Sequence, residues 1–487
     1  MAKKLVLTYV DSLRTDMLER AVEEGRAPTF GALLERGALV GDCVSSFPSV
    51  TPVACAEMVT GAAADRHWIS GMNWFHRLER RYVEYGSSLE ATRAVGVFRA
   101  LYDLVYNMNL AHLSPEVETL FERLDDAGVR TACTPFLIYR GRHRHQVSLE
   151  GLLRRAVETT RLKFRHHTWG PAELFYGDLY ASREVPCRST SIPGSRDGYS
   201  ACCAAELERD DAYDFLLFSL ADNDNYSHRH GPEASVESIA KADHCFAKLV
   251  EAGGGLAAFL ADHAVILLAD HAQTPVSRGL PLAELLGRDW IVLAPSDDRP
   301  ELAQLAVSPT GRAAHVYLLP GEGERADPDE VRRRLVETEG VDLVCRREGE
   351  AAVVEREGEQ LRFQPGAQIA DLRGVGWDLD GDPGVLAATV ENGCIQSDDY
   401  PDPLARVYAA VTAPHAGDFV VSLSPGYEAV DWGGISHAGG GSHGSLHAGD
   451  SLGPLLFVGC GPDDPADRAQ WTLRDVMPVV LSHFGIE

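Results

Sequence analysis

Carboxylate and imidazole side chains stand directly after apolar runs at several places in this chain. Residues 5–10 are mostly apolar and end on Asp11, and residues 264–269 run straight into Asp270 and His271. Runs of this length and composition are typical of buried strands in a parallel sheet. Functional residues in open α/β sheets gather beyond the carboxyl ends of the strands. We therefore expect these side chains to converge on one point.

A third apolar stretch, within residues 213–230, delivers Asp224 and then His228 four positions later. A single aspartate after a strand is more often a turn former or a helix cap, so Asp11 alone carries little weight. The repetition is what makes the set informative. Mixed Asp and His ligands without cysteine suit zinc, with manganese as the alternative.

The segment 46–61 is similar to the nucleophile segment of the alkaline phosphatase superfamily, specifically its nucleotide pyrophosphatase/phosphodiesterase and phosphonoacetate hydrolase branches. In that family a threonine precedes a helix that ends in Thr-Gly, and Thr51 falls on the nucleophile position. The segment 67–75 resembles the stretch that follows in the family. There Asn73 matches an asparagine that holds a non-bridging phosphoryl oxygen.

Two further segments carry the same resemblance. Residues 224–232 resemble the family's Asp-x-x-x-His-x-x-Gly-Pro ligand loop, and His443 with Gly444 resembles its last ligand, a His-Gly near the C-terminus. Two residues depart from the family pattern: Trp68 replaces a glycine, and Pro52 follows the nucleophile directly. Neither change removes a reacting group, but both reshape the pocket wall.

The resemblance implies two divalent metal ions, zinc or manganese. The ligands implied for one are Asp224, His228 and His443, and those implied for the other are Asp11, Asp270, His271 and Thr51. Two metals roughly 4 Å apart can ionise the nucleophile and stabilise the leaving oxygen of an anionic phosphodiester. The implied mechanism is in-line attack by Thr51, a covalent phosphothreonine and its hydrolysis, with Asn73 holding an equatorial oxygen.

Substrate contacts are less specific in the sequence. Trp74 and Phe75 are either an aromatic platform for a flat leaving group or core residues. Arg140 and Arg144, in a basic cluster, either reach distal phosphates or carboxylates of the substrate or lie in a solvated loop. His447 is a candidate to support the loop that carries the last ligand.

The resemblance makes the chain a metal-dependent phosphodiesterase or nucleotide pyrophosphatase. A phosphonoacetate-type hydrolase that cleaves a C–P bond shares every ligand and stays open as the alternative. A phosphomonoesterase fits less well, and a sulfatase needs a Cys or Ser with a following arginine that Thr51-Pro52 does not supply. A non-catalytic nucleotide-binding protein should have lost a ligand or the nucleophile.

Composition agrees with an enzyme of small anionic substrates. The formal net charge is −27, which argues against stable nucleic-acid or anionic-membrane binding. No apolar run of 18 residues occurs, and the first strand begins by residue 5, so we expect neither a membrane span nor a cleavable signal. Ten scattered cysteines indicate reduced thiols in a cytoplasmic protein. A homo-oligomer is compatible with the sequence.

At 487 residues the chain exceeds one ordinary core. We expect an α/β fold in which a mostly parallel, alkaline-phosphatase-like sheet is flanked by helices. Residues 1–295 and 426–487 would form this catalytic core, with a helical insertion over about 76–130, and residues 296–425 an inserted, smaller α+β cap. Helices are predicted over 16–36, 89–104 and 115–127 and from 233 to 251, and a strand over 131–139.

Overall fold

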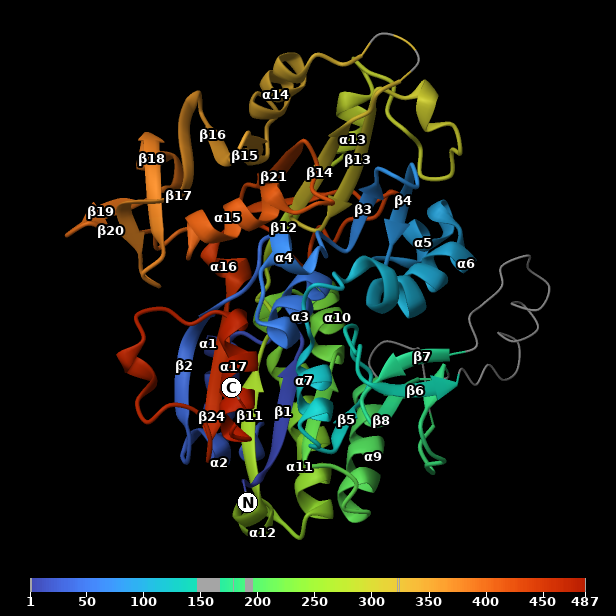
Figure 1. Cartoon of the computed structure of the whole chain (residues 1–487), viewed down its shortest axis with the longest axis vertical. Coiled ribbons are helices and arrows are strands. Elements are labelled where there is room, and N and C mark those ends of the chain that lie inside the picture. Colours follow the sequence, from blue (N-terminus) through green and yellow to red (C-terminus); the bar gives the residue numbers. More distant parts are fainter. Residues whose placement is uncertain are drawn as a thin grey trace.

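The structure, a computed structural model, describes residues 2–146, 167–177, 179–188, 196–321, 323 and 325–486. Two large sheets dominate these residues. The first, with eight strands, lies in the lower half of Figure 1, and the second, with nine, lies in the upper half, beyond the end of the first sheet where β1 finishes.

The first sheet is mostly parallel, as expected. In spatial order its strands are β2 (Ala38–Val44), β24 (Leu452–Val458), β11 (His263–Leu268), β1 (Lys4–Val10), β10 (Phe215–Leu220), β5 (Thr131–Cys133), β8 (Glu173–Tyr176) and β9 (Tyr180–Ala181). The five strands from β11 to β8 run parallel, while β24, β2 and β9 are antiparallel to their neighbours. The central position of β1 follows from its burial, since every residue from Leu5 to Val10 is buried.

Helices cover both faces of this sheet. On one face, where Val6 and Val10 of β1 point, pack α1 (Thr15–Glu23), α2 (Pro28–Leu34), α9 (Arg196–Arg209), α11 (Val236–Ala252) and α12 (Leu256–Asp262). On the other, which takes Leu5 and Leu7, pack α3 (Thr51–Thr60), α7 (Leu120–Asp126) and α17 (Val476–His483). Successive strand residues point to opposite faces, so a continuous apolar run serves both layers.

The second sheet is built from the region between residues 305 and 423. Its order is β13 (Leu305–Thr310), β14 (Ala313–Leu318), β21 (Phe419–Leu423), β15 (Val341–Glu348), β16 (Ala351–Arg356), β17 (Glu359–Asp371), β20 (Cys394–Gln396) and β19 (Thr389–Glu391), with β18 (Gly376–Gly381) paired to β17. Helices α14 (Pro328–Val336) and α15 (Pro403–Thr412) pack on it. The division of the chain into core and cap at residues 296 and 425 stays a prediction.

Smaller elements connect the two sheets. The hairpin of β3 (Asn73–His76) and β4 (Arg81–Glu84) precedes α5 (Leu89–Val95), α6 (Val97–Tyr102) and a π-helix (Asp103–His112). A three-stranded sheet joins β22 (Gly426–Ala429), β12 (Thr274–Leu280) and β23 (Gly441–Ser442). This sheet brings the segment after β11 next to the segment that holds His443.

Several predicted elements are shorter in the structure. The helix predicted over 16–36 is two helices, because Gly25 turns the chain with a φ of 69° and Pro28 starts a new helix. The strand predicted over 131–139 ends at Cys133, since Pro135 has no N–H for a sheet ladder. The helices predicted from residues 115 and 233 begin later, at Leu120 and Val236.

The cysteine prediction also needs a correction. Cys187 and Cys202 form a disulfide, so the thiols are not all reduced. Their spacing of 15 residues carries no motif, and the pairing joins the middle of α9 to the segment after β9. Among the described residues, no helix is long and apolar enough to cross a membrane.

Candidate metal centre

Three neighbouring strands of the first sheet deliver ligand-type side chains to one edge. Asp11 follows β1 directly, and Asp270 and His271 follow β11, which lies beside β1. On the other side of β1, β10 leads into α10 (Asp222–His230), which carries Asp224 and His228. A spacing of four residues puts these two on one face of the helix.

Two further residues arrive from other parts of the chain. Thr51 is the first residue of α3, and its hydroxyl lies 3.2 Å from Nε2 of His271. His443 follows the short strand β23, and its Nδ1 lies 2.8 Å from the carbonyl oxygen of Ser49. Gly440 lets this strand approach α10, because a Cβ there would lie 2.0 Å from the carbonyl oxygen of His228.

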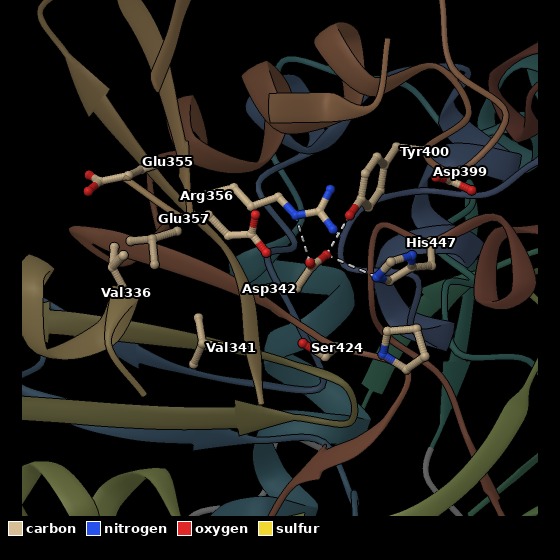
Figure 2. A pocket seen from close by; sticks show the side chains of 12 residues that line it. Val336, Val341, Asp342, Glu355, Arg356, Glu357, Asp399, Tyr400, Ser424 and His447 are labelled. Carbon is tan, nitrogen blue, oxygen red and sulfur yellow. Dashed lines mark hydrogen bonds and ion pairs between the residues drawn. The ribbon is translucent and has the colours of Figure 1, made fainter. Parts of the chain in front are cut away.

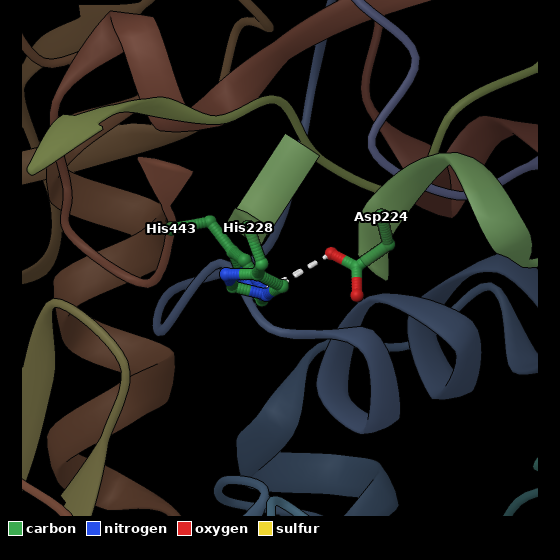
Figure 3. Close-up of side chains that lie close together, drawn as sticks. All are labelled: Asp224, His228 and His443. Atoms are coloured by element: carbon green, nitrogen blue, oxygen red, sulfur yellow. Dashed lines mark ion pairs between the residues drawn. The ribbon is translucent and has the colours of Figure 1, made fainter. Parts of the chain in front are cut away.

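The structure brings all seven of these side chains together, in two overlapping groups. Ligand atoms of Asp224, His228 and His443 lie within 4.8 Å of one another (Figure 3), and those of Asp11, Asp224 and His271 do the same. Asp270 adjoins the second group, with its Oδ2 3.1 Å from Nε2 of His271. Asp224 thus stands between the two sets that the sequence suggests.

Buried like charges make this cluster unfavourable without a cation. Burial, together with repulsion from Asp270 and Asp224, raises the pKa of Asp11 well above its usual range, and burial raises the pKa of Asp270 to about 6. Burial lowers the pKa of His271 to about 4 and that of His443 to about 3. The imidazoles of His271 and His443 are therefore neutral and can offer lone pairs to a metal. His228 differs, because the neighbouring Asp224 carboxylate raises its pKa to about 9 against the effect of burial, so a metal would have to displace its proton.

The donor set fits divalent metal ions. Oδ1 of Asp11 is buried without a hydrogen-bond partner, although a carboxylate in such a place needs a donor or a cation. The cluster joins three carboxylates, three imidazoles and the hydroxyl of Thr51, all nitrogen and oxygen ligands of the kind found in hydrolytic zinc sites. The residues present could therefore hold divalent cations.

Ser12 and Gln273 contact the candidate ligands, and no sequence motif points to either residue. The hydroxyl of Ser12 donates to Oδ1 of Asp224 at 2.8 Å and lies 3.2 Å from Nδ1 of His271. Gln273 donates from Nε2 to the same Asp224 oxygen at 2.6 Å. Ser12 has a φ of 58°, a conformation that turns the chain immediately after Asp11. In the sequence, the one sign of these roles is position: Ser12 directly follows Asp11, and Gln273 lies two positions after His271.

His437 is a second feature that spacing alone does not reveal. Its ring packs against the ring of His228 with centroids 4.0 Å apart and a tilt of 30°, and its Nδ1 lies 2.8 Å from the carboxylate of Glu428. Glu428 also accepts a hydrogen bond from Ser442, next to His443. A carboxylate that fixes an imidazole beside metal ligands orients the surrounding shell.

Asn73 lies on β3 opposite Glu84 of β4. Its side chain is buried and makes no hydrogen bond of good geometry, although it lies close enough to Glu84 to stabilise that carboxylate. A buried amide without a strong partner is a candidate for a ligand contact. Burial raises the pKa of Glu84 to about 7.

The aromatic candidates next to Asn73 pack in the interior. Trp74 is fully buried, donates from Nε1 to the hydroxyl of Tyr85 and stacks on His415 with centroids 4.1 Å apart. Phe75 is buried against Tyr82 and Tyr317. Of the two roles that the sequence left open, these contacts describe core packing.

The two basic candidates, Arg140 and Arg144, differ from the aromatic candidates in their contacts and from each other in their exposure. The guanidinium of Arg140 pairs with Glu122 at 3.1 Å and donates to the carbonyl oxygens of Ser114 and Val117. These contacts give Arg140 a structural role in holding a loop. Arg144 is exposed on β6 (His143–Gln146), which pairs with β7 (His167–Gly170).

A match to a family model makes the chain a hydrolase of the alkaline phosphatase superfamily. The family model for type I phosphodiesterase / nucleotide pyrophosphatase matches residues 5–446. The chain belongs to this family and is a phosphoric ester hydrolase. Enzymes of the family are generally metal-dependent. No curated protein matches the chain at a significant level.

Solved structures share the fold at low sequence identity. Phosphonoacetate hydrolase from Sinorhizobium meliloti 1021, in complex with phosphonoformate, is 15% identical with a TM-score of 0.56, over 99% of this chain and 95% of that one. Murine ectonucleotide pyrophosphatase / phosphodiesterase 5 is 15% identical with a TM-score of 0.55, over 100% and 96%. An inactive threonine-to-alanine variant of the murine protein, in complex with AMP, is 14% identical with a TM-score of 0.56 over the same shares.

Proposed function

We propose that this chain hydrolyses a small phosphodiester or nucleotide pyrophosphate, with Thr51 as the nucleophile and two divalent metal ions, zinc in preference to manganese. One observation carries the proposal. The hydroxyl of Thr51 lies beside His271 at the edge of a buried cluster of carboxylates and imidazoles that needs cations. A hydroxyl in such surroundings is the nucleophile that metal-assisted phosphoryl transfer requires.

The residues proposed to hold one metal are Asp224, His228 and His443, and those proposed to hold the other are Asp11, Asp270, His271 and Thr51. When bound, the two ions would supply positive charge that lowers the pKa of the threonine hydroxyl and neutralises the oxygens of the substrate. Ser12 and Gln273 fix the carboxylate of Asp224, which stands between the two sets.

The start of α3 and the side chain of Asn73 supply the contacts to the oxygens of the phosphoryl group. Thr51 begins α3, and its own backbone N–H is the donor proposed to hold an equatorial oxygen, because Pro52 has no N–H and the N–H of Val53 donates to the carbonyl oxygen of Val50. The buried amide of Asn73 supplies a second donor. Attack of the Thr51 oxygen on phosphorus breaks the bond to the leaving oxygen, and the hydroxyl proton passes to the leaving group or to solvent. Water then bonds to phosphorus through its oxygen and breaks the Thr51–phosphorus bond, and a proton of the water returns to the Thr51 oxygen.

Two of the similar structures support this reading. The murine protein whose threonine was replaced by alanine is described as inactive and holds AMP, which agrees with a threonine nucleophile and a nucleotide-type substrate. The bacterial phosphonoacetate hydrolase holds phosphonoformate, so a C–P bond hydrolase is the second candidate. Both candidates use the same ligand cluster and differ in the group attached to phosphorus.

Substrate comparison tests the proposal directly. Purified protein is assayed on an aryl phosphodiester, the matching monoester and phosphonoacetate, before and after chelation and after zinc or manganese is restored. The proposal predicts preference for the diester, loss of turnover on chelation and recovery with zinc. Preference for phosphonoacetate would replace the proposal with the second candidate, and chelator-resistant turnover would contradict the metal requirement.

A cytoplasmic location stays a prediction, and the bond between Cys187 and Cys202 counts against it, because disulfides persist mainly in oxidising compartments. Thiol titration of protein taken from the native host decides the point. Ten titrated thiols per chain would favour the cytoplasm, since ten cysteines are present.

A further inference from the structure

A turn of the second sheet reaches the metal-ligand cluster of the first. Strands β13 and β14 are joined at Gly311 and Arg312, and the backbone N–H of Arg312 donates to the carbonyl oxygen of His443 at 2.7 Å. Gly311 has a φ of 66°, and a Cβ there would lie 2.2 Å from the same oxygen. The turn is therefore pressed against the backbone of a proposed ligand.

The side chain of Arg312 continues this contact in the interior. It is 1% exposed and pairs with Asp450, whose Oδ1 lies 2.6 Å from Nη1. It also donates to the hydroxyl of Thr274 and, from Nε, to the carbonyl oxygen of Tyr427 at 3.1 Å. A planar guanidinium with several fixed acceptors holds its partners in one geometry, which a lysine cannot reproduce.

Asp450 also contacts the segment of residues 441–447, called here the His443 loop. Its Oδ2 accepts hydrogen bonds from the backbone N–H of Ser445 at 3.0 Å and from the hydroxyl of Ser445 at 2.6 Å. Thr274, the other side-chain partner of Arg312, lies on β12, which pairs with β23 at the start of the loop. Arg312 is thus connected to both sides of His443.

The second sheet contacts the loop at another point, shown in Figure 2. Asp342 of β15 lies 3.0 Å from Nε2 of His447, accepts a hydrogen bond from the hydroxyl of Tyr400 at 2.6 Å and pairs with Arg356 at 3.3 Å. These residues line a cavity of about 410 Å³. The support role expected for His447 is consistent with this contact, which joins the loop to the second sheet.

Thr310, the last residue of β13 before the turn, contacts a different part of the site. Thr310 accepts a hydrogen bond through Oγ1 from the backbone N–H of Met72, next to Asn73, at 3.1 Å. Thr310 and Arg312 therefore extend from one turn to separate groups, one to the segment of the phosphoryl-binding candidate and one to a metal ligand. A general loosening of the turn would affect both, whereas the two side chains should have separable effects.

We propose that Arg312 is a positioning residue that holds His443 in place to bind metal, so that the second sheet completes the metal centre of the first. This inference rests on the proposed function. It assigns the inserted region a part in building the site, in addition to any contact with substrate. The metal that depends on Arg312 is the one assigned to Asp224, His228 and His443.

The test is zinc affinity, measured by competition with a chromophoric chelator, together with thermal unfolding. Arg312→Lys keeps the charge and loses the fork geometry. Because a lone Asp450 would be buried without a partner, the second variant is the double change Arg312→Met with Asp450→Asn, which removes both charges. The control is Arg278→Gln, an exposed arginine of β12 that pairs with Glu339.

Folded Arg312→Lys or double-variant protein should bind one zinc equivalent at least about tenfold more weakly and keep the affinity of the other. Thr310→Val should keep both zinc affinities and lose turnover, and Arg278→Gln should change neither. Unchanged zinc affinity in the folded Arg312 variants would overturn the inference, and so would equal weakening of both equivalents. If the protein hydrolyses diesters and the Arg312 variants keep normal zinc affinity, the proposed function stands and this inference fails. If the protein binds zinc but hydrolyses no diester, the proposed function is refuted, and the zinc affinities of the variants still decide the role of Arg312.

Discussion

The two proposed ligand sets are held in place by different means. Asp11, Asp270 and His271 sit at the ends of β1 and β11, adjacent parallel strands buried on both faces. His443 instead stands on a loop, fixed by Ser49, by the turn of the second sheet and by the ion pair of Arg312 with Asp450. Asp11, Asp270 and His271 are positioned by the sheet itself, whereas His443 depends on side-chain and backbone contacts between distant segments.

The difference indicates where the site can tolerate change. A strand end in the core moves only if the sheet moves, so the first set should keep its geometry when peripheral contacts are lost. A ligand on a loop keeps its position only while the contacts that hold the loop are intact. We therefore expect substitutions outside the ligands to weaken the metal of His443 more than the metal beside Thr51.

The largest effect on the strand-end set should come from Asp270→Asn. Removing this charge should eliminate the metal beside Thr51 and lower kcat/KM by about 10³-fold or more. The same change relieves repulsion among buried carboxylates, so the metal-free variant should unfold at a higher temperature than metal-free wild-type protein. Metal analysis and calorimetry after chelation check both results. Full occupancy of two metals would contradict the ligand assignment.

His443→Ala should remove the other metal and leave the one beside Thr51. We expect a loss in kcat/KM of about 10²-fold to 10³-fold, since charge at the leaving oxygen is no longer neutralised. Zinc stoichiometry is the measurement, with one equivalent per chain expected. Loss of both equivalents would mean that the two sets are not independent, and the comparison would fail.

Ser12 links the two sets, because its hydroxyl contacts both Asp224 and His271. Ser12→Ala should lower activity by about tenfold to a hundredfold and weaken both zinc equivalents. The matched control is Ser277→Ala, an exposed serine of β12 whose hydroxyl donates to the carbonyl oxygen of Gly426. A Ser12 variant that weakens a single metal would show that the hydroxyl serves one set alone.

The hairpin that carries Asn73 offers a smaller, pH-dependent effect through Glu84. Burial raises the pKa of Glu84 to about 7 in the folded protein, above the ordinary value near 4.5. The folded state therefore retains a proton that the unfolded chain releases. The stability this contributes is complete below pH 4.5 and is lost as pH rises through 7, by on the order of 3 kcal/mol.

Glu84→Gln should accordingly reduce the loss of stability between pH 5 and pH 8. Denaturant unfolding at several pH values, compared with wild-type protein, measures the difference in slope. Parallel pH profiles for the two proteins would show that Glu84 does not titrate in this range. Metal-free protein is used throughout, so that ligand titration affects both proteins equally.

Sequence reasoning reached the strand-end ligands because a strand followed by Asp is a local pattern, and parallel strands bring such ends together. It reached Thr51 and His443 through family resemblance. It could not find Ser12, Gln273 or Arg312, since their roles arise from contacts between segments far apart in the chain. The cysteine pair was missed for the same reason, because pairing is set by the fold and not by spacing.

Arg140 and Trp74 show the opposite case, in which the sequence pattern carries too little information to choose between two roles. A run of basic residues cannot reveal that Glu122 and nearby carbonyl oxygens already occupy one guanidinium. An aromatic residue beside Asn73 likewise does not show which face of the hairpin is buried. Burial and prior partners decide between such alternatives, and both depend on tertiary packing.

Replacement of Thr51 by alanine tests the central claim most directly. Turnover of an aryl phosphodiester is compared between wild-type and Thr51→Ala protein, each shown by metal analysis to carry two zinc ions per chain. The account predicts that the variant keeps its metals and loses at least about 10⁴-fold in kcat, because the attacking oxygen is gone. Turnover within tenfold of wild type, with both metals bound, would contradict the threonine mechanism.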